Sequence, residues 1–241
     1  MPFELPATNW QSVQNLPGIL PTRQRRSQET TVALLEAGAE ALRDCAFDEL
    51  PINDLCAKVG ATIGAFYGRF ESKDAFFNAL VELMVRQCLT AINTALSDDA
   101  TASATLSDLC RQIVSVIVHA IHHHEGVLRA AMQYKTTHPS RWGKVRDTAH
   151  AILEVSTPLL LARMGHGRTA AKTRTIGFAF QLVFGTLING VLNKPKPVAL
   201  EDAEMVDRLA LVMYLQLDHE ARGGRIDGPR RMGRAQRNPS L

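Results

Sequence analysis

Residues 51–74 place small, polar and basic side chains in an order that suits contact with a nucleic acid. Four slim residues open a short predicted helix: Thr62, Ile63, Gly64 and Ala65. Slim side chains let the start of a helix enter the major groove of DNA, which is roughly 12 Å wide. The hydroxyl of Tyr67 can reach a phosphate. Lys73 lies at the start of a further predicted helix, where backbone amides also bind anions.

A second group of side chains with possible chemistry is the histidine cluster His119–His124. His119 and His123 are four residues apart, so they share one face of a helix, as paired metal ligands do. No carboxylate or thiolate stands at a spacing that completes a metal site, and histidines at a helix end suit its dipole. We therefore expect no metal and no cofactor. A metal-dependent enzyme that uses this cluster remains the remote alternative.

The helices that must position residues 62–67 follow from caps and apolar spacing. A first helix begins near Ser27 and repeats apolar residues at intervals of three or four. A second spans about residues 52–59 and ends at Gly60, where a left-handed residue is expected. Thr62 can cap a third helix to about residue 70, and Ser72 starts a long helix to about residue 96. Two short helices joined by a tight turn make a helix-turn-helix unit.

The remaining sequence also indicates helices, about nine in the whole chain, with no strand alternation, so the expected fold class is all-α. Overall, 46% of residues are hydrophobic and 21% are charged, which is ordinary for a globular protein. No apolar stretch is long enough to predict a membrane span, and the first ten residues have no secretory pattern. We therefore expect a cytoplasmic protein without a membrane partner.

The net charge of +3 is unevenly distributed. The tail 222–241 holds six arginines and one aspartate, a net charge of +5, so the rest of the chain carries −2. Bulk charge therefore does not argue for nucleic-acid binding, and the argument depends on local geometry. The tail is rich in glycine and arginine and is expected to be disordered.

Residues 23–84 resemble the N-terminal domain of TetR-type repressors. The resemblance lies in Leu34-Leu35-x-Ala37, in Phe47, and in the run from Pro51 to Asp74, with Gly60, Gly64, Tyr67, Phe70, Ser72 and Lys73 in the family's register. It implies a three-helix domain that binds double-stranded DNA, with a helix-turn-helix motif at about 51–70. A C-terminal helical domain would bind an effector and form a homodimer.

By matching position, the resemblance assigns roles to individual residues. Thr62, Ile63, Gly64 and Ala65 would face bases or adjacent phosphates, while Tyr67 and Lys73 would hold the backbone. Three arginines before the first helix would contact phosphate or the minor groove: Arg23, Arg25 and Arg26. The chain departs from the family at Ala46, where glycine is common, and at Gly68, where a larger residue is usual, so Arg69 becomes the candidate for the missing phosphate contact.

The same resemblance divides the chain into a flexible arm (1–21), a DNA-binding domain (22–76), an effector-binding and dimerisation domain (77–218) and a disordered basic tail (219–241). The dimer would form through the helices at about 169–193 and 202–217. The effector is unknown, small and mostly apolar, and the residues expected around it are Gln133, Tyr134, Trp142, His150, Phe178 and Gln181. The expected function is a repressor released from a pseudo-palindromic operator, and an effector-independent regulator or activator is the alternative.

Overall fold

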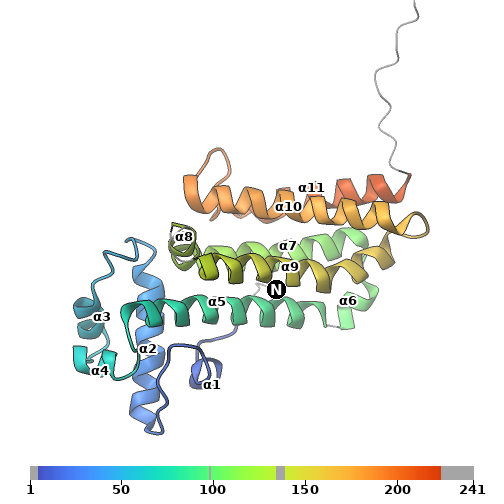
Figure 1. Ribbon diagram of the computed structural model, residues 1–241. Helices are drawn as coiled ribbons and strands as arrows, with labels where there is room; N and C mark the ends of the chain where they lie inside the picture. The colour runs from blue at the N-terminus through green and yellow to red at the C-terminus, as the bar shows by residue number, and fades with distance from the viewer. Residues whose placement is uncertain (1–4, 98, 134–138, 224–241) are drawn as a thin grey trace, which may run out of the picture.

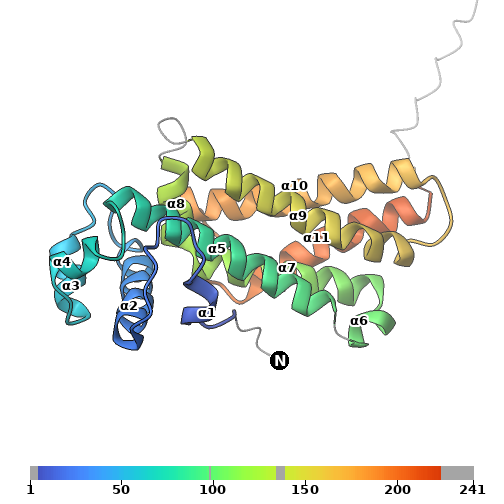
Figure 2. The same ribbon diagram turned by 60° about the horizontal axis from the view of Figure 1, so that its bottom comes forward.

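The computed structural model describes residues 5–97, 99–133 and 139–223, and these form eleven helices (Figures 1 and 2). They are α1 (Trp10–Val13), α2 (Arg25–Ala41), α3 (Ile52–Lys58), α4 (Ile63–Tyr67), α5 (Lys73–Leu96), α6 (Asp99–Ser103), α7 (Leu106–His123), α8 (Glu125–Gln133), α9 (Pro139–Arg163), α10 (Thr169–Asn193) and α11 (Glu204–Ala221). The all-α class is confirmed. The two helices beyond the predicted nine are the short α1 and α6.

At one end of the molecule, α2, α3, α4 and the start of α5 pack around a core of aromatic rings (Figure 1). Phe66, Phe70 and Phe76 are fully buried, and their ring centroids lie 4.8–5.2 Å apart. Leu55 and Cys56 of α3 are buried in the same cluster. The two short helices therefore pack together as the predicted helix-turn-helix unit, and this packing leaves the opposite side of α4 to solvent.

The turn between α3 and α4 has the backbone that the sequence predicts. Gly60 has φ +67°, a left-handed value that residues with a side chain rarely adopt. Thr62 then caps α4, because its Oγ1 accepts a hydrogen bond of 3.1 Å from the amide of Ala65. Ser72 caps α5 in the same way, accepting a bond of 3.0 Å from Ala75. These three residues fix where the two helices begin.

The N-terminal segment differs from the flexible arm that the sequence predicted. Asn9 and Ser12 form a capping box that starts α1, and Val13 and Leu16 are buried. This segment packs against α2 and α5 (Figure 1). Residues 5–21 therefore hold a capped helix and two buried apolar side chains, in a stretch that also contains three prolines and one glycine.

Two backbone carbonyls and one amide of this segment form hydrogen bonds to the middle of α5 and to Arg69 after α4. The bonds run from Gln87 Nε2 to the Pro6 carbonyl (2.8 Å), from Arg86 Nη1 to the Ser12 carbonyl (2.8 Å) and from the Leu20 amide to the Arg69 carbonyl (2.8 Å). The last bond joins the segment to the residue that follows α4. An isolated antiparallel bridge between Ile19 and Phe70 continues that contact.

The larger part of the molecule is a layered bundle. α5 packs against α7 and α9, α7 packs against α11, and α10 and α11 run side by side as an outer layer (Figures 1 and 2). Lys172 joins α10 to the end of α9: it is 4% exposed, and its Nζ donates to the carbonyls of Met164, Gly165 and His166 at 2.6–3.0 Å. Three carbonyl acceptors at a helix C-terminus satisfy this buried cation.

The end of the molecule formed by α2, α3 and α4 meets the bundle where α2 ends and α8 begins. A Cβ atom at Gly126 would lie 2.4 Å from the carbonyl carbon of Leu42, so the two backbones are in direct contact. Arg129 donates to the Leu42 carbonyl at 3.0 Å and pairs with Glu125 at 3.0 Å. Both partners of that ion pair are less than one-fifth exposed, so the junction is closely packed and its charges are matched.

Two helices differ from the expectation of no membrane-spanning segment. By length and composition alone, α5 and α10 are apolar enough to cross a membrane. In the structure, 56% of the apolar window in α5 is buried and 39% of that in α10. Core helices of globular proteins pass the same test, and α5 is such a helix. The less buried α10 has an apolar face that this chain alone does not cover.

The tail boundary also differs from the prediction. α11 continues to Ala221, so residues 219–221, which were expected in the tail, are helical. The expected disorder of the rest of the tail falls on residues 224–241, which lie outside the described residues.

Candidate nucleic-acid interface

The candidate reading surface is the outward face of α4 and the turn before it. Thr62 and Gly64 are exposed, Ile63 and Tyr67 are 47% and 48% exposed, and Ala65 is half-buried. Phe66 points inward and anchors the helix, with its ring 5.2 Å from that of Tyr67 and nearly perpendicular to it. The structure therefore brings these five predicted side chains together on one narrow surface. Apart from Tyr67, none is larger than isoleucine.

Three predicted arginines lie around the start of α2. Arg23, Arg25 and Arg26 are exposed, and the first turn of α2 holds no acidic residue. Arg25 pairs with Glu29 at 2.9 Å, but its side chain is 91% exposed, so this pair is weak and the cation stays accessible. A helix N-terminus with three cations and no nearby carboxylate in its first turn favours an anion such as phosphate.

Arg69 has partners that the sequence did not predict. Its Nε donates to the Ser27 carbonyl at 3.2 Å, and its Nη1 donates to the Ala65 carbonyl. The side chain is part-buried, and this burial lowers the pKa of the guanidinium. Arg69 therefore holds the end of α4 to the first turn of α2. This geometry suits a residue that positions the recognition helix, in place of the phosphate contact predicted for it.

Lys73 is also engaged within the chain. Its Nζ donates to the Asp48 carbonyl at 2.8 Å and lies 5.2 Å from the centroid of the Phe47 ring. The lysine thus joins the start of α5 to the loop before α3. An ammonium group has three N–H donors, so a contact to phosphate beside the N-terminus of α5 is compatible with this geometry.

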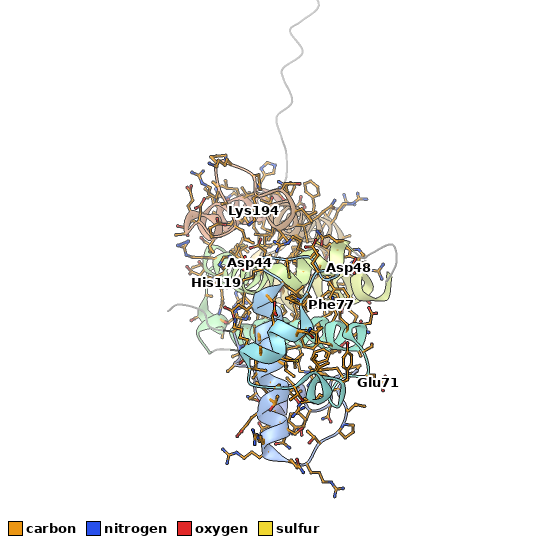
Figure 3. All side chains as sticks on the ribbon, turned by 90° about the vertical axis from the view of Figure 1, so that its left-hand side faces the viewer. Asp44, Asp48, Glu71, Phe77, His119 and Lys194 are labelled. Carbon is orange, nitrogen blue, oxygen red and sulfur yellow. The ribbon has the colours of Figure 1, made fainter. Side chains whose placement is uncertain are left out.

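The acidic residues mostly lie away from α4. Figure 3 looks onto the DNA-binding end and shows Asp44 and Asp48 where α2 ends, near the bundle. Glu40 pairs with Lys58 at 2.5 Å, and this contact lowers the pKa of Glu40. Two carboxylates lie close to α4 along the chain: Glu71 is exposed between Phe70 and the start of α5 (Figure 3), and Asp74 is exposed in the first turn of α5. Sequence reasoning missed Glu71, although its place next to the Ser72 cap was a visible signal.

The residues predicted around an effector are separated in the structure. Trp142 and Gln181 line a cavity of about 350 Å³ enclosed by α5, α7, α8, α9 and α10. Gln133 instead lines a different hollow, beside Arg43 and Lys194. His150 and Phe178 are exposed and lie outside that lining. Tyr134 lies outside the described residues.

The cavity has mostly apolar walls that sequence reasoning did not identify. It is lined by Met84, Val85 and Cys88 of α5, by Ile117, Ala120, Ile121 and His124 at the end of α7, by Leu128 of α8, by Val145, Arg146, Thr148, Ala149 and Ile152 of α9, and by Phe184, Gly185 and Ile188 of α10. These side chains come from five helices. Helical spacing in the sequence predicts which faces of each helix are apolar. It does not predict which of these faces border the same cavity.

A second cavity of about 510 Å³ lies between the N-terminal segment, α2, α5 and the α7–α8 connection. His124 belongs to the lining of both cavities. The metal interpretation of the histidine cluster gains nothing from the structure. The described residues contain no group of three or more His, Cys, Asp or Glu that could hold a metal ion, and Nδ1 of His119 is hydrogen-bonded to the Ser115 carbonyl at 2.7 Å.

Comparisons with known proteins agree with the geometry of α3 and α4. Residues 34–80 match the family model described as "Bacterial regulatory proteins, tetR family". The solved structures with a similar fold include a TetR transcriptional regulator from Rhodococcus sp. RHA1 (15% identity, TM-score 0.47, 81% of this chain and 98% of that chain) and Salmonella enterica GusR (15% identity, TM-score 0.46, 82% and 95%). No curated protein matches the chain. At residues 34–80 the chain carries the N-terminal helix-turn-helix domain of the TetR family, a family of DNA-binding transcriptional regulators.

Proposed function

We propose that this regulator is a dimeric repressor that leaves a pseudo-palindromic operator when a small, mostly apolar effector binds. The observation that carries this proposal is the course of α5. Its first residue, Lys73, lies beside the recognition helix, and three turns later Met84, Val85 and Cys88 line the apolar cavity. One continuous helix therefore touches both sites. A ligand that shifts α5 changes the position of α4.

The proposed dimer forms through the outer layer of α10 and α11. Large apolar side chains are exposed at helical spacing on both helices: Phe178 and Leu192 of α10, and Leu211, Val212 and Leu215 of α11. An exposed apolar surface that extends over two neighbouring helices is typical of a site that a partner covers. A two-fold axis between two copies would bury both stripes in a four-helix interface and present two α4 helices to an inverted repeat.

In this proposal, residues 22–76 bind DNA and residues 77–218 bind the effector and dimerise. Thr62, Ile63, Gly64 and Ala65 face the bases. Tyr67, Lys73 and the three arginines Arg23, Arg25 and Arg26 contact phosphates, which give affinity and register but no sequence choice. The apolarity of α10 is then explained by a protein interface, and the protein works in the cytoplasm, where its DNA is.

The test is the response of the DNA complex to ligands. A fluorescently labelled operator, obtained by selection from random duplexes, is titrated with the protein while a broad set of small apolar compounds is added. The proposal expects at least one compound to raise the dissociation constant tenfold or more. If no compound changes either the operator affinity or the melting temperature of the protein, the effector part of the proposal is wrong, and DNA binding stands without it.

A further inference from the structure

The walls of the 350 Å³ cavity exclude a strong charge on whatever it binds. Among the described residues, no aspartate or glutamate lines it, so a cationic ligand finds no counter-charge there. Within the described part of the chain, the only charged side chain in the lining is Arg146, which is 60% exposed and bonds to the neighbouring Asp147 at 3.1 Å. Moving an ion from water into an apolar space costs several kcal/mol unless a counter-charge is there. An uncharged ligand avoids that cost.

The polar groups in the lining differ in whether they are already occupied. The Oγ1 of Thr148 bonds to the Lys144 carbonyl at 2.8 Å, and Gln181 is exposed, which places it where the cavity opens. His124 is 5% exposed, and its Nε2 is buried without a hydrogen-bond partner among the described residues. Buried polar atoms nearly always have a partner, so Nε2 of His124, a residue that lines this cavity, has an unfilled hydrogen-bonding capacity.

We infer that the effector is an uncharged, largely apolar molecule with one hydroxyl or carbonyl group, and that this group hydrogen-bonds to Nε2 of His124. This inference rests on the proposed function, because it names the chemistry of the effector in the same cavity. The apolar walls contributed by α5, α7, α9 and α10 hold the body of the molecule, and His124 selects its polar end.

The surroundings of His124 support a neutral partner. Burial, together with smaller contributions from His123 and Arg43, lowers the pKa of the imidazole to about 3. At neutral pH the ring is therefore uncharged, with one nitrogen that donates and one that accepts. Such a ring bonds equally to a hydroxyl or a carbonyl and has no charge to offer a carboxylate. The centroids of the His123 and His124 rings lie 4.7 Å apart with the rings nearly perpendicular, and this contact limits how the His124 ring can turn.

The position of His124 in the chain links a ligand bound there to the DNA-binding helices. His124 ends α7 and directly precedes α8, whose Gly126 lies against the backbone of Leu42 at the end of α2. A ligand held at His124 is thus two residues from the contact between the bundle and the DNA-binding end. We therefore expect a ligand in this cavity to change the contact between Gly126 and Leu42.

The test is equilibrium dialysis of the full-length protein, without DNA, against four probes with one ring system: naphthalene, 2-naphthol, 2-naphthoate and 2-naphthylmethylammonium. We expect 2-naphthol to bind about fivefold more tightly than naphthalene, the gain of one net hydrogen bond, and both ions to bind more weakly than either. His124→Phe should remove the advantage of 2-naphthol and keep the binding of naphthalene. His150→Phe, on the exposed face of α9, is the matched control.

Two further variants show which cavity is occupied. Ala149→Phe fills the 350 Å³ cavity and should abolish binding, whereas Ala39→Phe fills the 510 Å³ cavity and should leave it unchanged. Tighter binding of either ion, no binding of any probe, an unchanged probe ratio in His124→Phe, or loss of binding in Ala39→Phe alone would overturn the inference. Because no DNA is present, these outcomes are separate from a failure of the probes to release an operator.

Discussion

The Nε of Arg69 donates a hydrogen bond to the carbonyl oxygen of Ser27 across 3.2 Å, which ties the residue after the recognition helix to the first turn of α2. The two residues are far apart in sequence, and the bond fixes the angle between α4 and the helix that carries the N-terminal arginines. Arg69 therefore affects DNA binding through the position of α4.

Replacing Arg69 should consequently differ from replacing a phosphate contact. Arg69→Ala is expected to lower the free energy of unfolding by about 1–3 kcal/mol, because two part-buried carbonyls lose a charged donor. It should weaken operator binding with little change in the dependence of log Kd on log salt. Arg25→Ala is the matched control: its stability should stay the same, and its salt slope should fall by about 1. The reverse pattern would make Arg69 the phosphate ligand.

Thr62 combines a cap with a place on the reading surface, and two substitutions separate these roles. Thr62→Ala removes the acceptor for the Ala65 amide and should cost about 1 kcal/mol of stability. Thr62→Ser keeps the hydroxyl and should restore the melting temperature. Selection of bound sequences from random duplexes should show a changed base preference for both variants. A preference identical to that of the unchanged protein would remove Thr62 from the base-facing set.

Tyr67 and Lys73 are expected to bind the DNA backbone. Tyr67→Phe and Lys73→Ala should each weaken binding to all duplexes alike, and only Lys73→Ala should make the salt slope shallower, because only it removes a charge. Lys73→Ala should also lower the melting temperature, since its bond to the Asp48 carbonyl is lost. Anisotropy titrations at several salt concentrations, on operator and on unrelated DNA, measure both effects. A loss confined to the operator would contradict the assignment.

Gly126 is expected to be essential to the junction between α8 and α2. In Gly126→Ala the new Cβ would lie 2.4 Å from Leu42 backbone atoms, so the two helices must separate. We expect a loss of stability of about 1–3 kcal/mol, as for overpacking elsewhere. Gly143→Ala is the control, because nothing lies within 4 Å of a Cβ there and a helical alanine is favoured. Thermal or denaturant unfolding of the two variants measures the difference, and equal stability would mean that the junction is loose.

The proposed dimer interface can be broken by a charge on its exposed stripe. Leu215 is 54% exposed on α11, so Leu215→Glu should leave the fold of one subunit intact while it prevents a second subunit from packing there. Sedimentation should show a monomer, and operator affinity should fall at least tenfold. Val155→Glu, at another exposed apolar residue on α9, should remain dimeric. If Leu215→Glu remains dimeric as Val155→Glu does, the dimer interface lies elsewhere.

Local sequence signals predicted the DNA-binding end well. Gly60 marks the end of a helix through its backbone preference, and Thr62 and Ser72 mark the starts of helices through capping. These effects act over three or four residues. The slim residues 62–65 and Tyr67 predicted which side of α4 faces outward. Each of these conclusions depends on neighbours along the chain, and the structure confirms them.

Long-range contacts were out of reach of the same reasoning. The acceptors of Arg69 and Lys73 include carbonyls of residues 42 and 25 positions away, and backbone carbonyls carry no sequence signature. The cavity was missed for a related reason: α10 is apolar on several faces, so spacing alone could not show that Phe178 faces outward and Phe184 faces the cavity. For the N-terminal segment a signal did exist, the Asn9–Ser12 capping box before Val13.

The most direct test of the account is selection of protein-bound DNA from a random duplex pool at physiological salt. The account predicts an enriched inverted repeat whose half-site centres lie one helical turn, about 34–36 Å, or a multiple of it apart, because two α4 helices of a two-fold dimer must reach successive major grooves. No enrichment by protein shown to be folded and dimeric would contradict a sequence-specific dimeric repressor.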